Sequence, residues 1–215
     1  MPLTRTFFGL ALSVLLLAGC NNGGGGGGGY DEGNDDAAEG AESDGTNREE
    51  SDGTNLEELA SVSATFEAAD SGADALTYSE AVPEGSTIDV RVVANVAGGT
   101  DFSIRLDGLE PDRDYGAHVH TDPCGPDPDD SGPHYQNRED PEQPSTSPRF
   151  ANPENEVWLD FTTDSDGAGG AQAGVTWQPR EGEANSVVVH EHHTHTGPDD
   201  SGTAGDRLAC VNVPL

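Results

Sequence analysis

Short alternating runs of hydrophobic and polar residues occupy the chain from about residue 61 onward. In Ile88-Asp89-Val90-Arg91-Val92 every other side chain is apolar, which is the period of a strand with one buried face. Turn residues such as Gly98-Gly99 and Asp166-Gly167 separate these runs, and no long segment has the spacing of an amphipathic helix. The pattern predicts seven or eight short strands, over residues 61–68, 88–96, 102–106, 115–120, 157–162, 171–177 and 187–190.

Strands at this density predict an all-β fold. We expect a Greek-key β-sandwich or barrel, immunoglobulin-like, of about eight strands within residues 58–215. One connection is unusual, because eight prolines lie between His120 and Val157. Loops of this length are usually functional or disordered. This Pro-rich loop also contains a Cys and a His, so we expect it to be functional.

The first 57 residues have a different character. Arg5 precedes an apolar stretch, residues 7–18, that is too short to span a bilayer comfortably and is typical of a signal peptide, here 1–19. Leu17-Ala18-Gly19-Cys20 resembles the lipobox of bacterial and archaeal lipoproteins, which implies cleavage before Cys20 and a lipid on its sulfur. The alternative is an ordinary signal peptide with a chance Cys. Residues 20–57, rich in Gly and acidic residues, predict a disordered linker.

Either reading of the N-terminus predicts an exported protein. With the lipid at Cys20, we expect a lipoprotein on the outer face of the cell membrane, or a periplasmic or outer-membrane one. Export places the cysteines in an oxidising compartment. If Cys20 carries lipid, Cys124 and Cys210 remain, and they can form one disulfide.

The chain is strongly acidic. It has 41 acidic residues against nine basic ones, all of them Arg, and a formal net charge of −32. This charge argues against binding to nucleic acid or to an anionic membrane surface. Adaptation to a salty exterior and compositional drift both remain open as its origin.

Two closely spaced His residues are the first candidates for a functional site. His118 and His120 lie in the strand-like run Tyr115–His120, where a period of two points both imidazoles to one face. Two imidazoles side by side on a rigid strand form half of a transition-metal site. The alternative is a pair of His that merely lines a sheet face.

Several motifs, in order, resemble the copper/zinc superoxide dismutase family over about residues 100–215. The matching motifs are Gly116-Ala117-His118-Val119-His120 followed by Cys124, Gly132-Pro133-His134-Tyr135, Asp164-Ser165-Asp166-Gly167, Val188-Val189-His190-Glu191 and Gly202–Cys210. The resemblance implies copper ligands at His118, His120, His134 and His190. It also implies a disulfide between Cys124 and Cys210, and a catalytic site in which Arg207 guides superoxide and His134 takes part.

The departures from the family pattern concern zinc. In the family, the equivalent of His134 bridges copper and zinc, and further His residues in the long loop complete the zinc site. Here no His lies between Tyr135 and Val189, so the zinc site is expected to be absent, as in the copper-only branch. His134 should then bind copper through one nitrogen while protein or water bonds the other.

The leading hypothesis is an extracytoplasmic superoxide dismutase that serves as an antioxidant and converts superoxide to oxygen and hydrogen peroxide at a His-ligated copper. The alternative is a non-catalytic lipoprotein of this fold that buffers or delivers copper. A relative that has lost its metal is disfavoured, because all four ligand positions and Arg207 are filled. Three further residues, His192, His193 and His195, form either a second metal site, a copper-collecting patch or a solvated loop.

Overall fold

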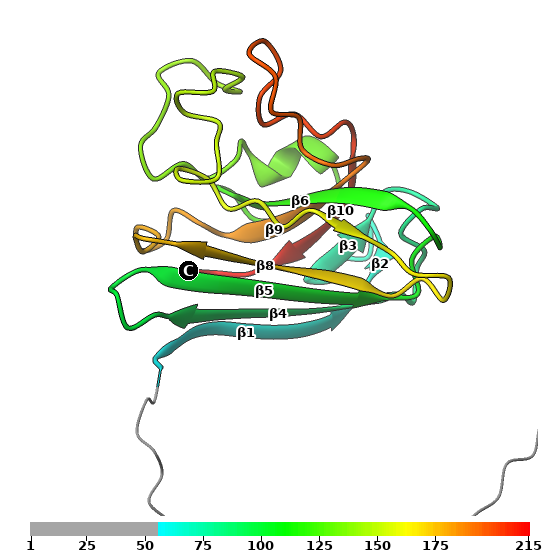
Figure 1. Ribbon diagram of the computed structural model, residues 1–215. Coiled ribbons are helices and arrows are strands. Elements are labelled where there is room, and N and C mark those ends of the chain that lie inside the picture. Colours follow the sequence, from blue (N-terminus) through cyan, green and yellow to red (C-terminus); the bar gives the residue numbers. More distant parts are fainter. Residues whose placement is uncertain (1–55) are drawn as a thin grey trace, which may run out of the picture. The chain divides into compact units, whose positions relative to one another are not determined.

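Ten strands in two sheets make up the protein in a computed structural model that describes residues 56–215 (Figure 1). The predicted signal peptide, Cys20 and nearly all of the predicted linker lie outside the described residues. The four-stranded sheet has the order β1 (Glu58–Thr65), β4 (Thr87–Ala94), β5 (Thr100–Asp107) and β8 (Gly169–Val175). The six-stranded sheet has the order β2 (Glu67–Ala68), β3 (Ala75–Thr77), β10 (Arg207–Asn212), β9 (Ser186–His190), β6 (Asp114–His120) and β7 (Phe161–Thr162).

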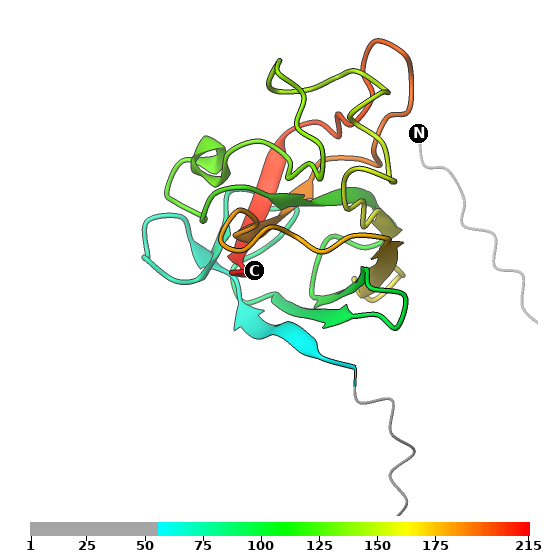
Figure 2. The same cartoon turned by 90° about the vertical axis from the view of Figure 1, so that its left-hand side faces the viewer.

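The core lies between the sheets. On β4, Ile88, Val90 and Val92 are buried while the residues between them are exposed, as the alternating pattern predicts. The strands β6 and β9 are buried on both faces, because the core covers one face and long loops cover the other. Those loops, residues 121–160 and 191–206, rise above the six-stranded sheet in both ribbon views (Figures 1 and 2).

The alternation on β6 decides which side chains meet the loops. Ala117 and Val119 belong to the hydrophobic core, so His118 and His120 point to the opposite face of the sheet. On β9, Val187 and Val189 belong to the same core. His190 therefore faces the loops together with the two His of β6.

A disulfide ties the first part of the long loop to β10. The bonded residues are Cys124 and Cys210, with their Cα atoms 5.7 Å apart. This confirms the pairing expected from the sequence. Nearby, the single-turn 3-10 helix η1 (Pro128–Ser131) lies within the tethered segment.

The predicted all-β class and sandwich are confirmed, and within residues 56–215 the sheets do not close into a barrel. The strand count is higher than expected because β2, β3 and β7 have only two or three residues each. The strand predicted over 157–162 is mostly irregular: Phe161–Thr162 pairs with β6, and Trp158 forms an isolated bridge to His118. The buried strand β10 carries no alternation to mark it.

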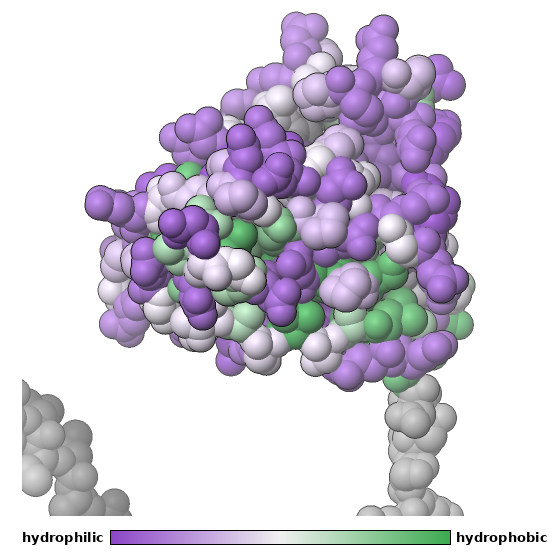
Figure 3. All heavy atoms as spheres, turned by 180° about the vertical axis from the view of Figure 1, so that it is seen from behind, coloured by the Kyte–Doolittle hydropathy of each residue, from purple (hydrophilic) through white to green (hydrophobic). Residues whose placement is uncertain are grey.

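The surface reflects the composition, since the face in Figure 3 is mostly hydrophilic with small apolar patches. The large hydrophobic residues exposed in the described part of the chain are Leu56 and Val96. Among residues 56–215, no helix is long and apolar enough to cross a bilayer.

Candidate metal centre

Four imidazoles from three parts of the chain meet on the loop-facing side of the six-stranded sheet. Each offers one nitrogen, and these four nitrogens lie within 4.8 Å of one another; the residues are His118, His120, His134 and His190. Two come from β6 and one ends the neighbouring strand β9. His134 is brought alongside by an isolated bridge to His120. The four predicted ligands are therefore placed together.

The turn that delivers His134 depends on a glycine. Gly132 has φ of +70°, and a Cβ there would lie 2.0 Å from a carboxylate oxygen of Asp122. Its carbonyl oxygen lies 2.9 Å from His120 Nδ1. The same turn thus positions one ligand and orients another.

The tautomer of His118 follows from its partner. Thr194 Oγ1 donates to Asp160 over 2.6 Å, so this hydroxyl accepts from His118 Nε2, 2.7 Å away. The neutral ring then carries its lone pair on Nδ1. That nitrogen is fully buried and has no hydrogen-bond partner in the described structure. A buried nitrogen without a partner is costly unless a ligand such as a metal ion satisfies it.

The rings of His120 and His190 are oriented in the same way. His120 Nδ1 donates to the carbonyl oxygen of Gly132, and His190 Nδ1 faces that of Gly205 at 3.4 Å. Both Nε2 atoms therefore carry lone pairs, and they lie 3.3 Å apart. Two lone pairs at this distance repel unless something positive lies between them. Two nitrogens bound to one ion at ~2 Å also lie roughly 3 Å apart.

His134 is held by a buried carboxylate. Its Nδ1 lies 3.0 Å from Glu156 Oε2, which leaves Nε2 for the cluster. Glu156 is only 1% exposed and also accepts from Trp158 Nε1 and Gln136 Nε2, each at 2.7 Å. Partners of this kind fix the ring of a ligating His and raise its basicity. This matches the expectation that protein or water bonds the second nitrogen.

Burial keeps the rings of His118, His120 and His190 neutral at physiological pH. It lowers the pKa of His118 and His120 well below 6.5, and charge on His134 and His190 lowers both further. Burial, followed by charge on His134, lowers the pKa of His190 to about 3. Metal binding requires neutral imidazole, so these three residues can bind a cation without losing protons. The donor set of four imidazole nitrogens fits a transition-metal ion, copper included.

Arg207 lies beside this cluster as the cross-strand partner of His190 in the β10–β9 ladder. Its Nη1 donates to the carbonyl oxygen of Pro128 at 3.0 Å and to Ser131 Oγ at 2.8 Å. Asp129 Oδ1 lies 3.8 Å from its Nε. The positive charge of Arg207 contributes to the low pKa of both His120 and His190. A guanidinium held this close to the centre can dock a small anion.

The three additional His residues do not act as one group. The rings of His192 and His195 stack, with centroids 4.6 Å apart and planes 18° from parallel. His193 instead bonds the carbonyl oxygen of Phe161 through Nε2 at 3.0 Å, away from that pair. Within residues 56–215, only the four-His cluster brings three or more potential ligands together.

Sequence reasoning missed the residues that orient the ligands. Glu156, Thr194 and Asp160 lie in loops, and Ser131 lies in the single-turn helix η1, so no periodic pattern marks them. Glu156 directly precedes the apolar run Val157-Trp158-Leu159, so its position in the chain gives only a weak signal. Its burial depends on how the long loop folds.

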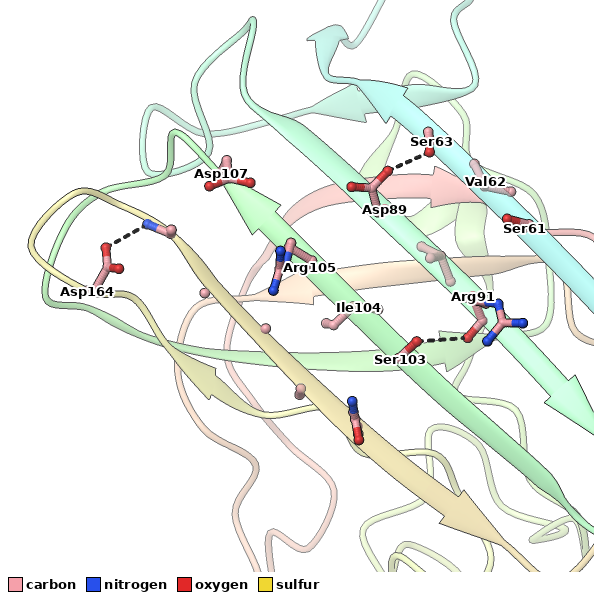
Figure 4. A pocket seen from close by; sticks show the side chains of 16 residues that line it. Ser61, Val62, Ser63, Asp89, Arg91, Ser103, Ile104, Arg105, Asp107 and Asp164 are labelled. Atoms are coloured by element: carbon pink, nitrogen blue, oxygen red, sulfur yellow. Dashed lines mark hydrogen bonds between the residues drawn. The ribbon is translucent and has the colours of Figure 1, made fainter. Parts of the chain in front are cut away.

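A separate hollow of about 990 Å³ lies on the outer face of the four-stranded sheet (Figure 4). Its lining includes Ser63, Asp89, Arg91 and Arg105 but no His, and it shares no residue with the four-His cluster. The side chain of Arg105 has no hydrogen bond or ion pair within the described residues. Removal of Arg105 is therefore a matched control for removal of the Arg207 charge.

The model of the copper/zinc superoxide dismutase (SODC) family matches residues 85–213, and a comparison with curated proteins gives no significant match. Similar solved structures include a double mutant of a SOD-like protein from Bacillus subtilis, with 19% identity, a TM-score of 0.45, and coverage of 61% of this chain and 91% of that one. Another is the clock protein EA4, with 16% identity, a TM-score of 0.48, and coverage of 75% and 96%. Since the family model matches more than half of its length, the chain belongs to the copper/zinc superoxide dismutase family.

Proposed function

We propose that this protein is a copper-dependent superoxide dismutase, an oxidoreductase that converts two superoxide ions and two protons to oxygen and hydrogen peroxide. The observation that carries the proposal is the pairing of Arg207 with His190, which places an anion-docking group at the edge of the four-imidazole cluster. A metal store needs the imidazoles alone. An enzyme acting on a small anion also needs the guanidinium.

The four imidazoles would hold copper through His118 Nδ1 and through Nε2 of His120, His134 and His190. When bound, copper supplies the alternation between two oxidation states that the reaction needs, and imidazole suits both. Arg207 would bind superoxide electrostatically, and Pro128 and Ser131 keep its guanidinium in place. His134 would hold a proton on Nδ1 against Glu156.

We propose that the centre works without zinc. In the family pattern the equivalent of His134 bridges copper and zinc, whereas here its Nδ1 lies against the Glu156 carboxylate. The chain between Tyr135 and Val189, which includes most of the long loop, contains no imidazole. In this proposal Glu156 orients His134 in place of the second metal.

The site of action follows from the N-terminal sequence. We propose that the chain is exported and anchored by a lipid on Cys20, outside the cytoplasmic membrane, where it would remove extracellular superoxide. The support is the sequence Leu17-Ala18-Gly19-Cys20 after an apolar stretch, together with the disulfide between Cys124 and Cys210, which suits an oxidising compartment.

Stopped-flow measurement of superoxide decay tests the proposal. We expect the copper-loaded protein to accelerate decay far above the metal-free protein, and inhibition of this activity by azide, an anion that competes for the same site. Firm copper binding without acceleration would instead support the non-catalytic copper-binding alternative.

A further inference from the structure

The loop that joins β9 to β10 carries two imidazoles that the proposed dismutase centre does not use. This loop, residues 191–206, begins directly after His190 and ends directly before Arg207 (Figure 1). Backbone hydrogen bonds hold its two arms together: His192 N to Ala204 O at 3.1 Å, His195 N to Thr203 O at 2.8 Å and Gly202 N to His195 O at 2.9 Å. The positions of His192 and His195 are therefore fixed by the backbone.

The protonation of both rings follows from their partners. His192 Nδ1 lies 2.9 Å from the carbonyl oxygen of His193, which can only accept, so this nitrogen carries the proton. His195 Nδ1 lies 3.0 Å from the carboxylate of Asp200. In the neutral rings both lone pairs are thus on Nε2. Neither Nε2 has a hydrogen-bond partner within the part of the chain that the structure describes.

This arrangement is the one in which proteins prepare a His to bind a metal. Ligating His residues almost always donate their other N–H to a carboxylate or a backbone carbonyl. The two rings are stacked with centroids 4.6 Å apart. Two nitrogens that share an ion at ~2 Å must come within about 4 Å of each other. In the stacked arrangement the in-plane lone pairs of the two rings run side by side. His195 is half exposed, so its ring has room to turn Nε2 toward an ion bound by His192.

The surroundings favour a cation. The loop contains Glu191, Asp199, Asp200 and Asp206 and no basic residue. His192 packs against Gly205, where an added Cβ would lie 3.0 Å from the ring, and against the stacked ring of His195. Imidazole nitrogens select Cu(II), Zn(II) and similar ions over Mg(II) and Ca(II), which prefer oxygen.

From these contacts we infer that His192 and His195 form a second, exposed site for a divalent transition-metal ion, with Asp200 as the positioning residue for His195. His193 is outside the site because its Nε2 is engaged with Phe161. The inference does not depend on the dismutase proposal, since it concerns binding alone. Of the alternatives that the sequence left open for this His run, the inference selects a second metal site for His192 and His195 over a solvated loop.

Calorimetric titration with Zn²⁺ tests the site. The full protein is first loaded with one equivalent of Cu(II), which Zn²⁺ does not displace from the four-His cluster because copper binds such sites more tightly. Excess Mg²⁺ is present to occupy carboxylates. We expect one Zn²⁺ per chain, at least tenfold weaker binding after His192→Gln or His195→Gln, and weaker binding after Asp200→Ala.

The matched control is His193→Gln, which changes the adjacent imidazole and should leave Zn²⁺ binding unchanged. The inference is overturned if the unmodified protein binds no Zn²⁺ under these conditions. It is equally overturned if binding survives the double variant His192→Gln/His195→Gln. The titration measures Zn²⁺ binding and not superoxide turnover. Failure of this site can therefore be distinguished from failure of the proposed function.

Discussion

Arg207 and His190 face each other across neighbouring strands, as partners in the β10–β9 ladder. Strand β9 therefore ends with a candidate metal ligand at the point where β10 begins with a fixed positive charge. The disulfide between Cys124 and Cys210 holds the loop that carries Pro128 and Ser131 against the same strand. This relationship explains how one local register assembles both parts of the proposed site.

Removal of the Arg207 guanidinium should separate catalysis from metal binding. We expect Arg207→Ala to lower kcat/KM for superoxide by about tenfold or more, because electrostatic guidance of charged substrates is worth 10- to 1,000-fold in rate. Copper content should stay at the unmodified level. Arg105→Ala, on the outer face of the other sheet, removes the same charge away from the cluster and should change the rate little. Equal losses in both variants would refute a specific role for Arg207.

Glu156 should matter through His134. Glu156→Gln keeps the shape of the side chain but removes the charge that His134 Nδ1, Trp158 and Gln136 share. We expect copper affinity to fall by roughly 10- to 100-fold, the usual effect of changing a partner of a metal ligand. Competition against a copper chelator measures this change. Glu154→Gln, an exposed neighbour, should have no effect, and an unchanged affinity in Glu156→Gln would remove Glu156 from the site.

The metal-free fold should be sensitive to acid. His118, His120 and His190 have folded-state pKa values below the ordinary 6.5, and that of His190 is about 3. Below pH 6.5 the unfolded chain therefore binds protons that the folded protein does not, so the free energy of unfolding falls as pH decreases from 6.5 toward 3. We expect the thermal midpoint to drop between pH 7 and pH 5 when measured in 1 M salt, which screens the acidic surface. A midpoint that stays level over this interval contradicts the burial of neutral imidazoles.

Salt should affect the proposed superoxide turnover in an unusual direction. Residues 56–215 contain 31 acidic residues and seven Arg, a net charge of −24, so the overall field repels superoxide. Screening shortens this field to about 3 Å at 1 M salt. We expect turnover to be retained or to rise between about 0.05 and about 1 M NaCl, because added salt screens the repulsion. A steep loss of rate with salt would mean that local attraction near Arg207 outweighs the repulsion.

The sequence predicts the candidate ligands better than the residues that hydrogen-bond and orient them. His118 and His120 could be predicted because the period of two in a strand shows which residues share a face. His134, His190, Arg207 and the disulfide followed from motifs whose order matched a known family, and the structure brings these residues together.

The residues that orient the ligands could not be predicted, because their positions depend on how the loops fold over the sheet. Glu156 and Thr194 reach the cluster from segments without regular structure, where burial is decided by tertiary contacts rather than by spacing. The roles of His192, His193 and His195 were also ambiguous, because side chains in a loop have no periodic orientation that the sequence reveals. Only the structure separates His193 from the stacked pair His192 and His195.

The most direct test of the central claim is superoxide turnover measured as copper is added stepwise to metal-free protein, with no zinc present. We predict that turnover rises linearly to one copper per chain and then stays constant, because one buried four-His centre carries the activity. A protein that remains inactive at one equivalent, or becomes active only after zinc is added, would contradict a copper-only dismutase.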